Sequence, residues 1–220
     1  TYKHKRQHSP KNIRMNAVSL IIKQKVFLYE DISMEERLQI AVFVSGTGTT
    51  LQTLIDKQDQ YGFQVALVVA NCTCLALERA ATCCIPSVET KDWTEIDNAL
   101  LNHKIDMIVL AGFLAIVPRW ICEKWERHII NIHPSLLPKH GGKGMYGIHV
   151  QESVLKAKDT EAGCTVHYVS AEVDGGGIIA QAKVEVKPDD TPEILSARVQ
   201  EQEKILLPYV IGELKNKWYE

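Results

Sequence analysis

The sequence predicts an α/β fold, with a mostly parallel, twisted sheet and helices on both faces. Apolar runs of strand length alternate with segments of helical spacing between Leu38 and Leu110, which is typical of strands joined by right-handed helical crossovers. A glycine-rich turn at residues 45–48 directly follows the first apolar run and precedes a helical pattern. A strand, a glycine turn and a helix N-terminus together indicate a Rossmann-like N-terminal half.

Size and charge restrict the class of protein. The chain has 220 residues, 45% of them apolar, and a formal net charge of −2. This length suits one well-buried domain, and this charge provides no positive field for nucleic acid or an anionic membrane. The best candidate for a membrane span, residues 17–28, is interrupted by Lys23, Gln24 and Lys25. We therefore expect a soluble monomer or weak homodimer that binds small molecules, with no nucleic acid and no membrane partner.

The cysteine pattern favours a reducing compartment. The six cysteines lie in or beside predicted strands and helices rather than forming a disulfide scaffold, so a cytoplasmic location is expected. Cys72, Cys74, Cys83 and Cys84 lack the usual ligand spacing of a zinc cluster. We therefore expect no metal.

Residues 1–33 do not share the α/β pattern. Basic side chains stand among polar residues with no acid before Glu30, which is typical of a solvated tail, with nucleic-acid contact as the alternative. Residues 18–29 are β-prone enough to add a strand or a helix, and Met34 fits equally well as a natural start behind an added leader. The expected organisation is an N-terminal extension, residues 1–33, followed by a single domain, residues 34–220.

The expected elements of the N-terminal half follow from apolar periodicity. Strands are expected at residues 38–44, 63–70 and 106–110, and helices from residue 51 onward, at 76–84 and at 93–104. In the last of these helices, Ile96, Leu100 and Leu101 are expected to face the core. Pro118 is expected to open a short helix toward Trp125.

The expected elements of the C-terminal half surround a mobile-looking, glycine-rich loop at residues 139–147, a candidate lid. They are a strand ending at residues 131–133, a helix from residue 149, strands at 163–169 and 178–186 joined by a turn at 170–177, and a last helix from about 190 toward 214. Residues 190–193 suggest a capping box at the start of this helix.

Asn131 and His133 stand two residues apart at the end of a predicted buried strand. Side chains at this spacing point to the same side of a strand, while Ile132 between them points into the core. Pro134 should end the pairing and leave both polar groups at the edge where open α/β sheets bind ligands. The alternative is that Asn131 caps a local turn and His133 is a hydrogen-bonded core histidine.

The glycine turn predicts an anion site. Backbone N–H groups and the helix dipole at such a turn favour a phosphate. The full dinucleotide fingerprint is absent, because Leu51 stands where its third glycine would be. A plain tight turn is the alternative.

Three motifs together carry a resemblance to a known family. The run Asn-Ile-His-Pro-Ser-Leu-Leu-Pro at residues 131–138, with Val-Ser-Gly-Thr-Gly at 44–48 before it and Val-Asp-Gly-Gly at 173–176 after it, resembles the phosphoribosylglycinamide formyltransferases. The similarity covers about residues 38–212. It implies a formyltransferase fold, 10-formyltetrahydrofolate as co-substrate and 5′-phosphoribosylglycinamide as acceptor in purine synthesis.

Formyl transfer passes through a tetrahedral intermediate with an oxyanion, which needs a hydrogen-bond donor and a group that moves protons. The Asn131 amide suits the first task and the His133 imidazole the second. An imidazolium needs an anionic partner, and the resemblance gives this role to Asp174. A surface turn aspartate before glycine is otherwise commonplace.

The resemblance also implies substrate contacts. The acceptor phosphate is expected on Gly48, Thr49 and Thr50, and its ribose on Glu203. The folate pocket is expected to be lined by Leu114, Ala115, Ile116, Val117 and Asn131. Residues 170–174 would close over this pocket, and His167 matches a family histidine near the site.

The chain departs from the family pattern at several positions. Thr50 replaces a commoner asparagine, Ala115 a commoner arginine and Gly177 a commoner proline. Near residues 88–93, where many members have a folate-contacting arginine, only Lys91 is positively charged. The rival interpretations are a formyltetrahydrofolate deformylase with the same site, a methionyl-tRNA formyltransferase, which would need a further C-terminal domain, and a non-catalytic nucleotide-binding module.

Overall fold

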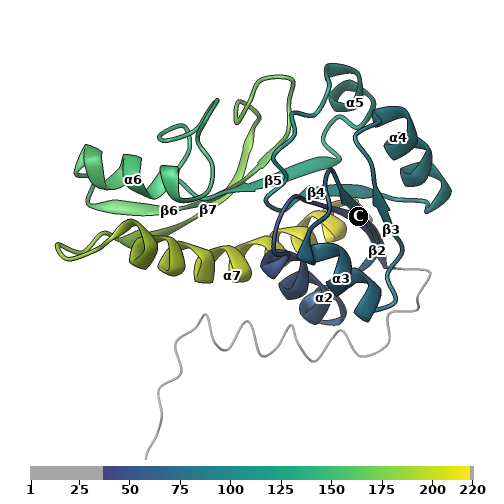
Figure 1. Ribbon diagram of the computed structural model, residues 1–220, viewed down its shortest axis with the longest axis horizontal. Helices are drawn as coiled ribbons and strands as arrows, with labels where there is room; N and C mark the ends of the chain where they lie inside the picture. The colour runs from purple at the N-terminus through teal and green to yellow at the C-terminus, as the bar shows by residue number, and fades with distance from the viewer. Residues whose placement is uncertain (1–36, 219–220) are drawn as a thin grey trace, which may run out of the picture. The chain divides into compact units, whose positions relative to one another are not determined.

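The computed structural model describes residues 37–218, so the expected N-terminal extension, residues 1–33, and Met34 lie outside the described residues. Within residues 37–218 the chain forms one seven-stranded sheet in the order β3-β2-β1-β4-β5-β6-β7 (Figure 1). The strands are β1 (Leu38–Val44), β2 (Phe63–Ala70), β3 (Ser87–Glu89), β4 (Met107–Leu110), β5 (Ile129–His133), β6 (Glu161–Tyr168) and β7 (Ile178–Glu185). The helices are α2 (Thr49–Tyr61), α3 (Leu75–Thr82), α4 (Trp93–Asn102), α5 (Arg119–Lys124), α6 (Ile148–Ala157) and α7 (Pro192–Trp218).

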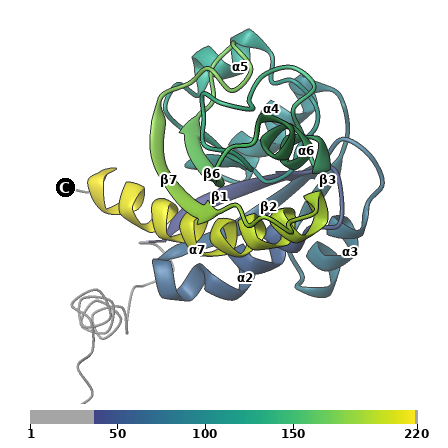
Figure 2. The same cartoon turned by 90° about the vertical axis from the view of Figure 1, so that its left-hand side faces the viewer.

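The sheet is mostly parallel, as the sequence predicts. Strands β3, β2, β1, β4 and β5 pair in parallel, while β6 and β7 join antiparallel at the β5 edge. Helices α2, α3 and α7 cover one face, and α4 and α5 cover the other (Figures 1 and 2). The expected α/β fold with helices on both faces is therefore confirmed.

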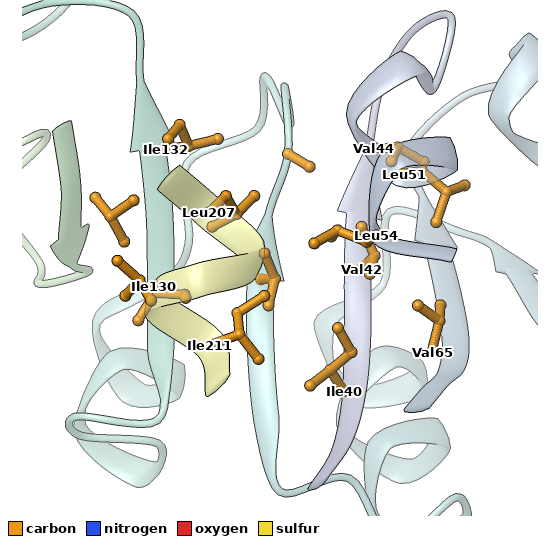
Figure 3. Close-up of a cluster of buried hydrophobic side chains, with 14 of the residues drawn as sticks. Ile40, Val42, Val44, Leu51, Leu54, Val65, Ile130, Ile132, Leu207 and Ile211 are labelled. Carbon is orange, nitrogen blue, oxygen red and sulfur yellow. The ribbon is translucent and has the colours of Figure 1, made fainter. Parts of the chain in front are cut away.

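Strand β1 shows why both faces must be covered. Ile40, Val42 and Val44 belong to one hydrophobic cluster of the described chain, while Ala41 and Phe43 belong to the other. Alternating side chains of a strand point to opposite faces, so a strand that is apolar throughout needs a helix layer on each side. Figure 3 shows the first cluster, where α2 and α7 pack over β1 and β5.

Two expectations about helices were wrong. Leu101 is 54% exposed instead of facing the core, because Ile96 and Leu100 already define the buried stripe of α4 and the next residue is turned about 100° away from it. The reciprocal capping box of α7 does not form, since the helix starts at Pro192 and its N3 residue is Ile194. The cap is instead the Thr191 hydroxyl, which accepts from the Ile194 N–H at 3.4 Å.

The topology brings distant segments to one edge of the sheet. The carboxyl ends of the parallel strands β1, β4 and β5 all face this edge, where α/β sheets commonly bind ligands. Antiparallel pairing sets Asn131 of β5 opposite His167 of β6. As a result, the loops after β1, β4 and β5 lie beside the turn between β6 and β7. None of the helices within residues 37–218 has the length and apolar content to cross a membrane.

Candidate active site

A cavity of about 790 Å³ opens at this edge of the sheet. Its walls come from the β1–α2 turn, the loop after β4, the end of β5, residues 142–148, residues 167–174 and α7. Every site residue that the sequence singles out lines it: Gly48, Thr49, Thr50, Leu114, Ala115, Ile116, Val117, Asn131, His133, Asp174 and Glu203. Residues far apart in the chain therefore share one cavity.

Asn131 and His133 both face the cavity from the end of β5, while Ile132 is buried in the core. The His133 ring is nearly buried, with 4% of the residue exposed. Its Nε2 donates to the main-chain carbonyl of His140 at 3.0 Å, and its Nδ1 lies 3.6 Å from Asp174 Oδ2. Both ring nitrogens thus face acceptor groups.

Asp174 approaches the histidines from the turn between β6 and β7. Its Oδ2 accepts from the Gly142 N–H at 2.8 Å, and its Oδ1 lies 3.7 Å from Nε2 of His167. Its φ of 53° is in the left-handed region, which aspartate tolerates better than most residues. The turn packs closely at Gly176, where any Cβ would collide with the carbonyl oxygen of Tyr168. Glycine is needed there for the carboxylate to reach β5.

His167 fixes the orientation of the Asn131 amide. Burial lowers the pKa of the His167 imidazole, which favours the neutral ring. Its Nδ1 donates to the Tyr168 carbonyl at 2.9 Å, so its Nε2 accepts from Asn131 Nδ2 at 3.1 Å. One amide proton of Asn131 is used in this contact, and the second remains for a ligand in the cavity.

The glycine turn meets the N-terminus of α2. Gly48 caps this helix with φ 72°, and no acidic residue lies in the first turn. A Cβ on Gly48 would lie 2.7 Å from the Cβ of Ala76, so α3 packs directly against the turn. Arg79 of α3 donates through Nε to the Thr47 carbonyl at 2.8 Å. The first N–H groups of a helix lack partners within it, so this turn offers donors to an anion.

Ser45 was expected only as part of the glycine turn at residues 45–48, and Arg79 was not expected near the site. The Ser45 hydroxyl donates to Asn71 Oδ1 at 2.7 Å and accepts from the Leu114 N–H at 2.9 Å. It thereby ties the β1–α2 turn to the loop after β4. Nothing in the spacing of these residues along the chain signals either contact.

The wall formed by the loop after β4 is apolar. Leu114 and Ile116 are 60% and 66% exposed, whereas Val117 is buried. Exposed apolar side chains beside a cavity suit a flat aromatic ligand. Lys91 is not among the lining residues.

Glu203 contributes the most unusual titratable group of the cavity. It lies on α7, is 9% exposed, and burial raises the pKa of its carboxyl to about 7. A carboxyl of this kind accepts hydrogen bonds from hydroxyls when ionised and can donate one when protonated.

Metal ligands are not apparent in the described part of the chain. No group of three or more His, Cys, Asp or Glu side chains within residues 37–218 has a geometry that could hold a metal ion. All of the cysteines, including Cys72, Cys74, Cys83 and Cys84, are free thiols.

Both the sequence and the fold are similar to those of known proteins. The family described as Formyl transferase matches residues 38–211. Phosphoribosylglycinamide formyltransferase of Haemophilus influenzae is 38% identical over 193 residues, which cover 82% of this chain and 86% of the relative. The trifunctional purine biosynthetic protein adenosine-3 of Drosophila melanogaster is 38% identical over 196 residues, 83% of this chain but only 14% of that protein. The chain thus spans about one seventh of this longer relative.

Solved structures share the fold. Phosphoribosylglycinamide formyltransferase from Anaplasma phagocytophilum superimposes with a TM-score of 0.77 at 34% identity, covering 82% of this chain and 88% of that chain. A formyltetrahydrofolate deformylase from Pseudomonas syringae has a TM-score of 0.74 at 24% identity, covering 82% of this chain and 62% of that chain. The deformylase therefore shows a common fold and no more.

Proposed function

We propose a function from family membership, because the chain belongs to the formyl transferase family and, within it, to the phosphoribosylglycinamide formyltransferases. The proposed reaction transfers the formyl group of 10-formyltetrahydrofolate to the amino group of 5′-phosphoribosylglycinamide in de novo purine biosynthesis. The observation that carries the proposal is that Asn131, His133 and Asp174 line one cavity together with the N-terminus of α2. The other activities implied by the name of the trifunctional relative are outside this proposal.

The chemistry begins when the neutral acceptor amine attacks the formyl carbon. The carbonyl oxygen becomes an oxyanion, the amine nitrogen loses a proton, and the bond from the formyl carbon to N10 of the folate breaks as N10 gains a proton. Asn131 would donate its second amide proton to the oxyanion, since the first is used by His167. Loss of one such donor typically costs ~10²–10³ in rate.

His133 would move the protons. Because its Nε2 donates to the His140 carbonyl, its Nδ1 is the nitrogen available to take a proton from the amine and return it to the leaving nitrogen. The Asp174 carboxylate, 3.6 Å from Nδ1, would stabilise the imidazolium that forms between these transfers. Asp174 is in turn oriented by the Gly142 N–H.

The substrates are proposed to lie along the cavity. The acceptor phosphate would bind the N–H groups of Gly48, Thr49 and Thr50, and its ribose hydroxyls would meet Glu203. The folate ring would bind the apolar wall formed by residues 114–117. Backbone contacts would carry much of this recognition, which is compatible with Thr50 and Ala115 at positions where the family pattern has asparagine and arginine.

The sequence also supports proposals for domain organisation, location and oligomeric state. We assign residues 34–220 to a single formyltransferase domain and residues 1–33 to an N-terminal extension. A cytoplasmic location is supported by the free thiols. We also propose a monomer or weak homodimer that uses no metal and has no nucleic-acid or membrane partner.

A spectroscopic folate assay tests the reaction. Purified protein is mixed with 10-formyltetrahydrofolate, and loss of the formyl group is followed with and without phosphoribosylglycinamide. Formyl loss that requires the acceptor and yields one formylated acceptor per folate supports the proposal. Rapid formate release without acceptor would identify a hydrolase instead. No reaction in either case would refute both functions.

A further inference from the structure

Residues 140–142, which lie shortly after the Asn131–Pro138 motif, contact both His133 and Asp174 through the main chain. The His140 carbonyl accepts from His133 Nε2 at 3.0 Å, and the Gly142 N–H donates to Asp174 Oδ2 at 2.8 Å. These two backbone groups belong to one short segment. Any movement of that segment would therefore change the position of the imidazole relative to the carboxylate.

The chain from Gly142 onward provides little rigidity. Gly142, Gly144 and Gly147 all have positive φ, and regular structure resumes only at Ile148, where α6 begins. Glycine leaves a chain more conformational freedom than any other residue. The contacts that hold the His140 carbonyl in place must then come from elsewhere.

The side chain of His140 supplies such contacts. Its Nδ1 lies 2.8 Å from the hydroxyl of Ser153 on α6, and its Nε2 lies 3.0 Å from Oδ2 of Asp159, just beyond that helix. The ring is well enclosed, with 12% of the side chain exposed. The hydrogen bond from His140, followed by that from Lys139, lowers the pKa of the Asp159 carboxyl, so this group is the anionic partner of the pair. We call these three side chains, Ser153, His140 and Asp159, the clamp.

The clamp does not open on the catalytic cavity. His140 and Asp159 line a second cavity of about 210 Å³, together with Leu136 and Lys139, and Ser153 lines neither cavity. Any effect of the clamp on the reaction must therefore pass through the backbone of residue 140, because these side chains cannot touch substrate.

From this geometry we propose that His140 is a positioning residue for formyl transfer, with its ring held by Ser153 and Asp159 so that its carbonyl orients the His133 imidazole. The carbonyl accepts the Nε2 proton of His133 and so selects the tautomer whose Nδ1 is free for proton transfer. This inference rests on the proposed function, because it assigns His140 a part in that reaction. Asp174 is the charged group beside His133, and it also lies near His167. Asp159 is the charged group beside His140, and it also pairs with Lys139.

The test compares two substitutions of the same residue. His140→Phe keeps an aromatic ring but removes both polar contacts, whereas His140→Gln retains one acceptor for Ser153 and one donor for Asp159. We expect kcat of His140→Phe to fall roughly tenfold to a hundredfold, since small misplacements of a catalytic group cost rates of this order. The KM values for both substrates should change little, and His140→Gln should recover part of kcat.

The matched control is Lys139→Met, which removes the other partner of Asp159 but leaves the ring contacts. Lys139 is 67% exposed, and exposed ion pairs contribute little, so its kcat should remain at the wild-type value. If His140→Phe fails to fold, the double variant Ser153→Ala/Asp159→Ala removes both partners of the ring and should show the same loss of kcat. Wild-type kcat in His140→Phe or, in that case, in the double variant would overturn the proposal.

A measurement that does not depend on turnover tests the role of the clamp separately from the proposed function. Nitrogen NMR of His133 should show the proton on Nε2 in the wild type and a mixture of tautomers in His140→Phe, with a changed pH profile of kcat. An unchanged ring signal in the variant refutes the clamp even if the enzyme transfers formyl groups. A wild-type protein that shows the expected ring signals but no transfer refutes the proposed function and leaves the ring orientation standing.

Discussion

The turn between β1 and α2 and the cluster at the end of β5 line the same cavity, yet different contacts build them. The turn is shaped by glycine backbone and by close packing, with Gly48 against Ala76 of α3. The cluster depends on side-chain hydrogen bonds, in which His167 holds Asn131 and a main-chain carbonyl holds His133. A site that binds through backbone groups tolerates substitutions of its side chains but not a Cβ added to a closely packed glycine. A site that depends on side-chain hydrogen bonds tolerates few substitutions of those side chains.

Removing the imidazole should break the side-chain cluster most severely. We expect His133→Ala to remain folded and to lose turnover by ~10²–10⁴, the range typical of a lost general acid–base group. The initial rate of acceptor-dependent formyl transfer and thermal unfolding by circular dichroism measure the two effects. His103→Ala is the control, because the His103 ring at the end of α4 bonds the Ala99 carbonyl and His103 does not line the cavity. Turnover near the wild-type rate in His133→Ala would remove this residue from the mechanism.

Neutralising the carboxylate is a milder change to the same cluster. Asp174→Asn keeps an oxygen that can accept from the Gly142 N–H but loses the negative charge beside His133 and His167. We expect the fold to persist and kcat to fall by roughly 10², since the charge acts through the imidazolium rather than on the substrate. The same assay measures it, with the exposed Asp189→Asn as the control. If both variants turn over at the same rate, the negative charge of Asp174 does not contribute to catalysis.

The two regions also differ in how far sequence predicts them. The bounds expected for β1 and β2, residues 38–44 and 63–70, agree with the structure because strands buried on both faces read as continuous apolar runs. That the site residues share a cavity follows from topology, since parallel strand ends meet at one edge. The family motifs then indicate which residues at that edge carry chemistry, and their individual roles remain predictions.

The contacts that orient the catalytic side chains were not predictable in this way. The His140 carbonyl and the Gly142 N–H act through the main chain, and every residue has these groups, so residue type gives no signal. Leu101 fails for a related reason. Its apolar character fits a buried position, but the helix phase is fixed by Ile96 and Leu100. Tertiary context decides both cases.

The backbone-built region can be tested by adding a single methyl group. Gly48→Ala should place a Cβ 2.7 Å from that of Ala76 at a φ of 72°, costing about 1–2 kcal/mol of stability from the left-handed backbone alone. We expect KM for the phosphate-bearing acceptor to rise roughly tenfold because the helix N–H groups shift, with a smaller effect on kcat. Gly62→Ala is the matched control, since Gly62 also has a left-handed φ of 71° but does not line the cavity. Equal KM values for the two variants would contradict a phosphate site at this turn.

Glu203→Gln should have the smallest effect on turnover but a clear effect on the pH dependence of stability. Burial raises the pKa of the Glu203 carboxyl from 4.5 to about 7, so between these values the folded protein holds a proton that the unfolded chain has released. The free energy of unfolding therefore falls as pH rises through this window and stays lower above it.

Glutamine cannot ionise, so Glu203→Gln should gain stability relative to the wild type between pH 4.5 and 8, by at most about 3 kcal/mol. Urea unfolding at a series of pH values measures this, with Glu201→Gln, an exposed acid paired with Lys204, as the control. If the stability curves of Glu203→Gln and the wild type are parallel, the Glu203 carboxyl ionises in the folded protein at no cost. The acceptor end of the cavity would then hold a negative charge, and not a protonated carboxyl that forms hydrogen bonds with the ribose hydroxyls.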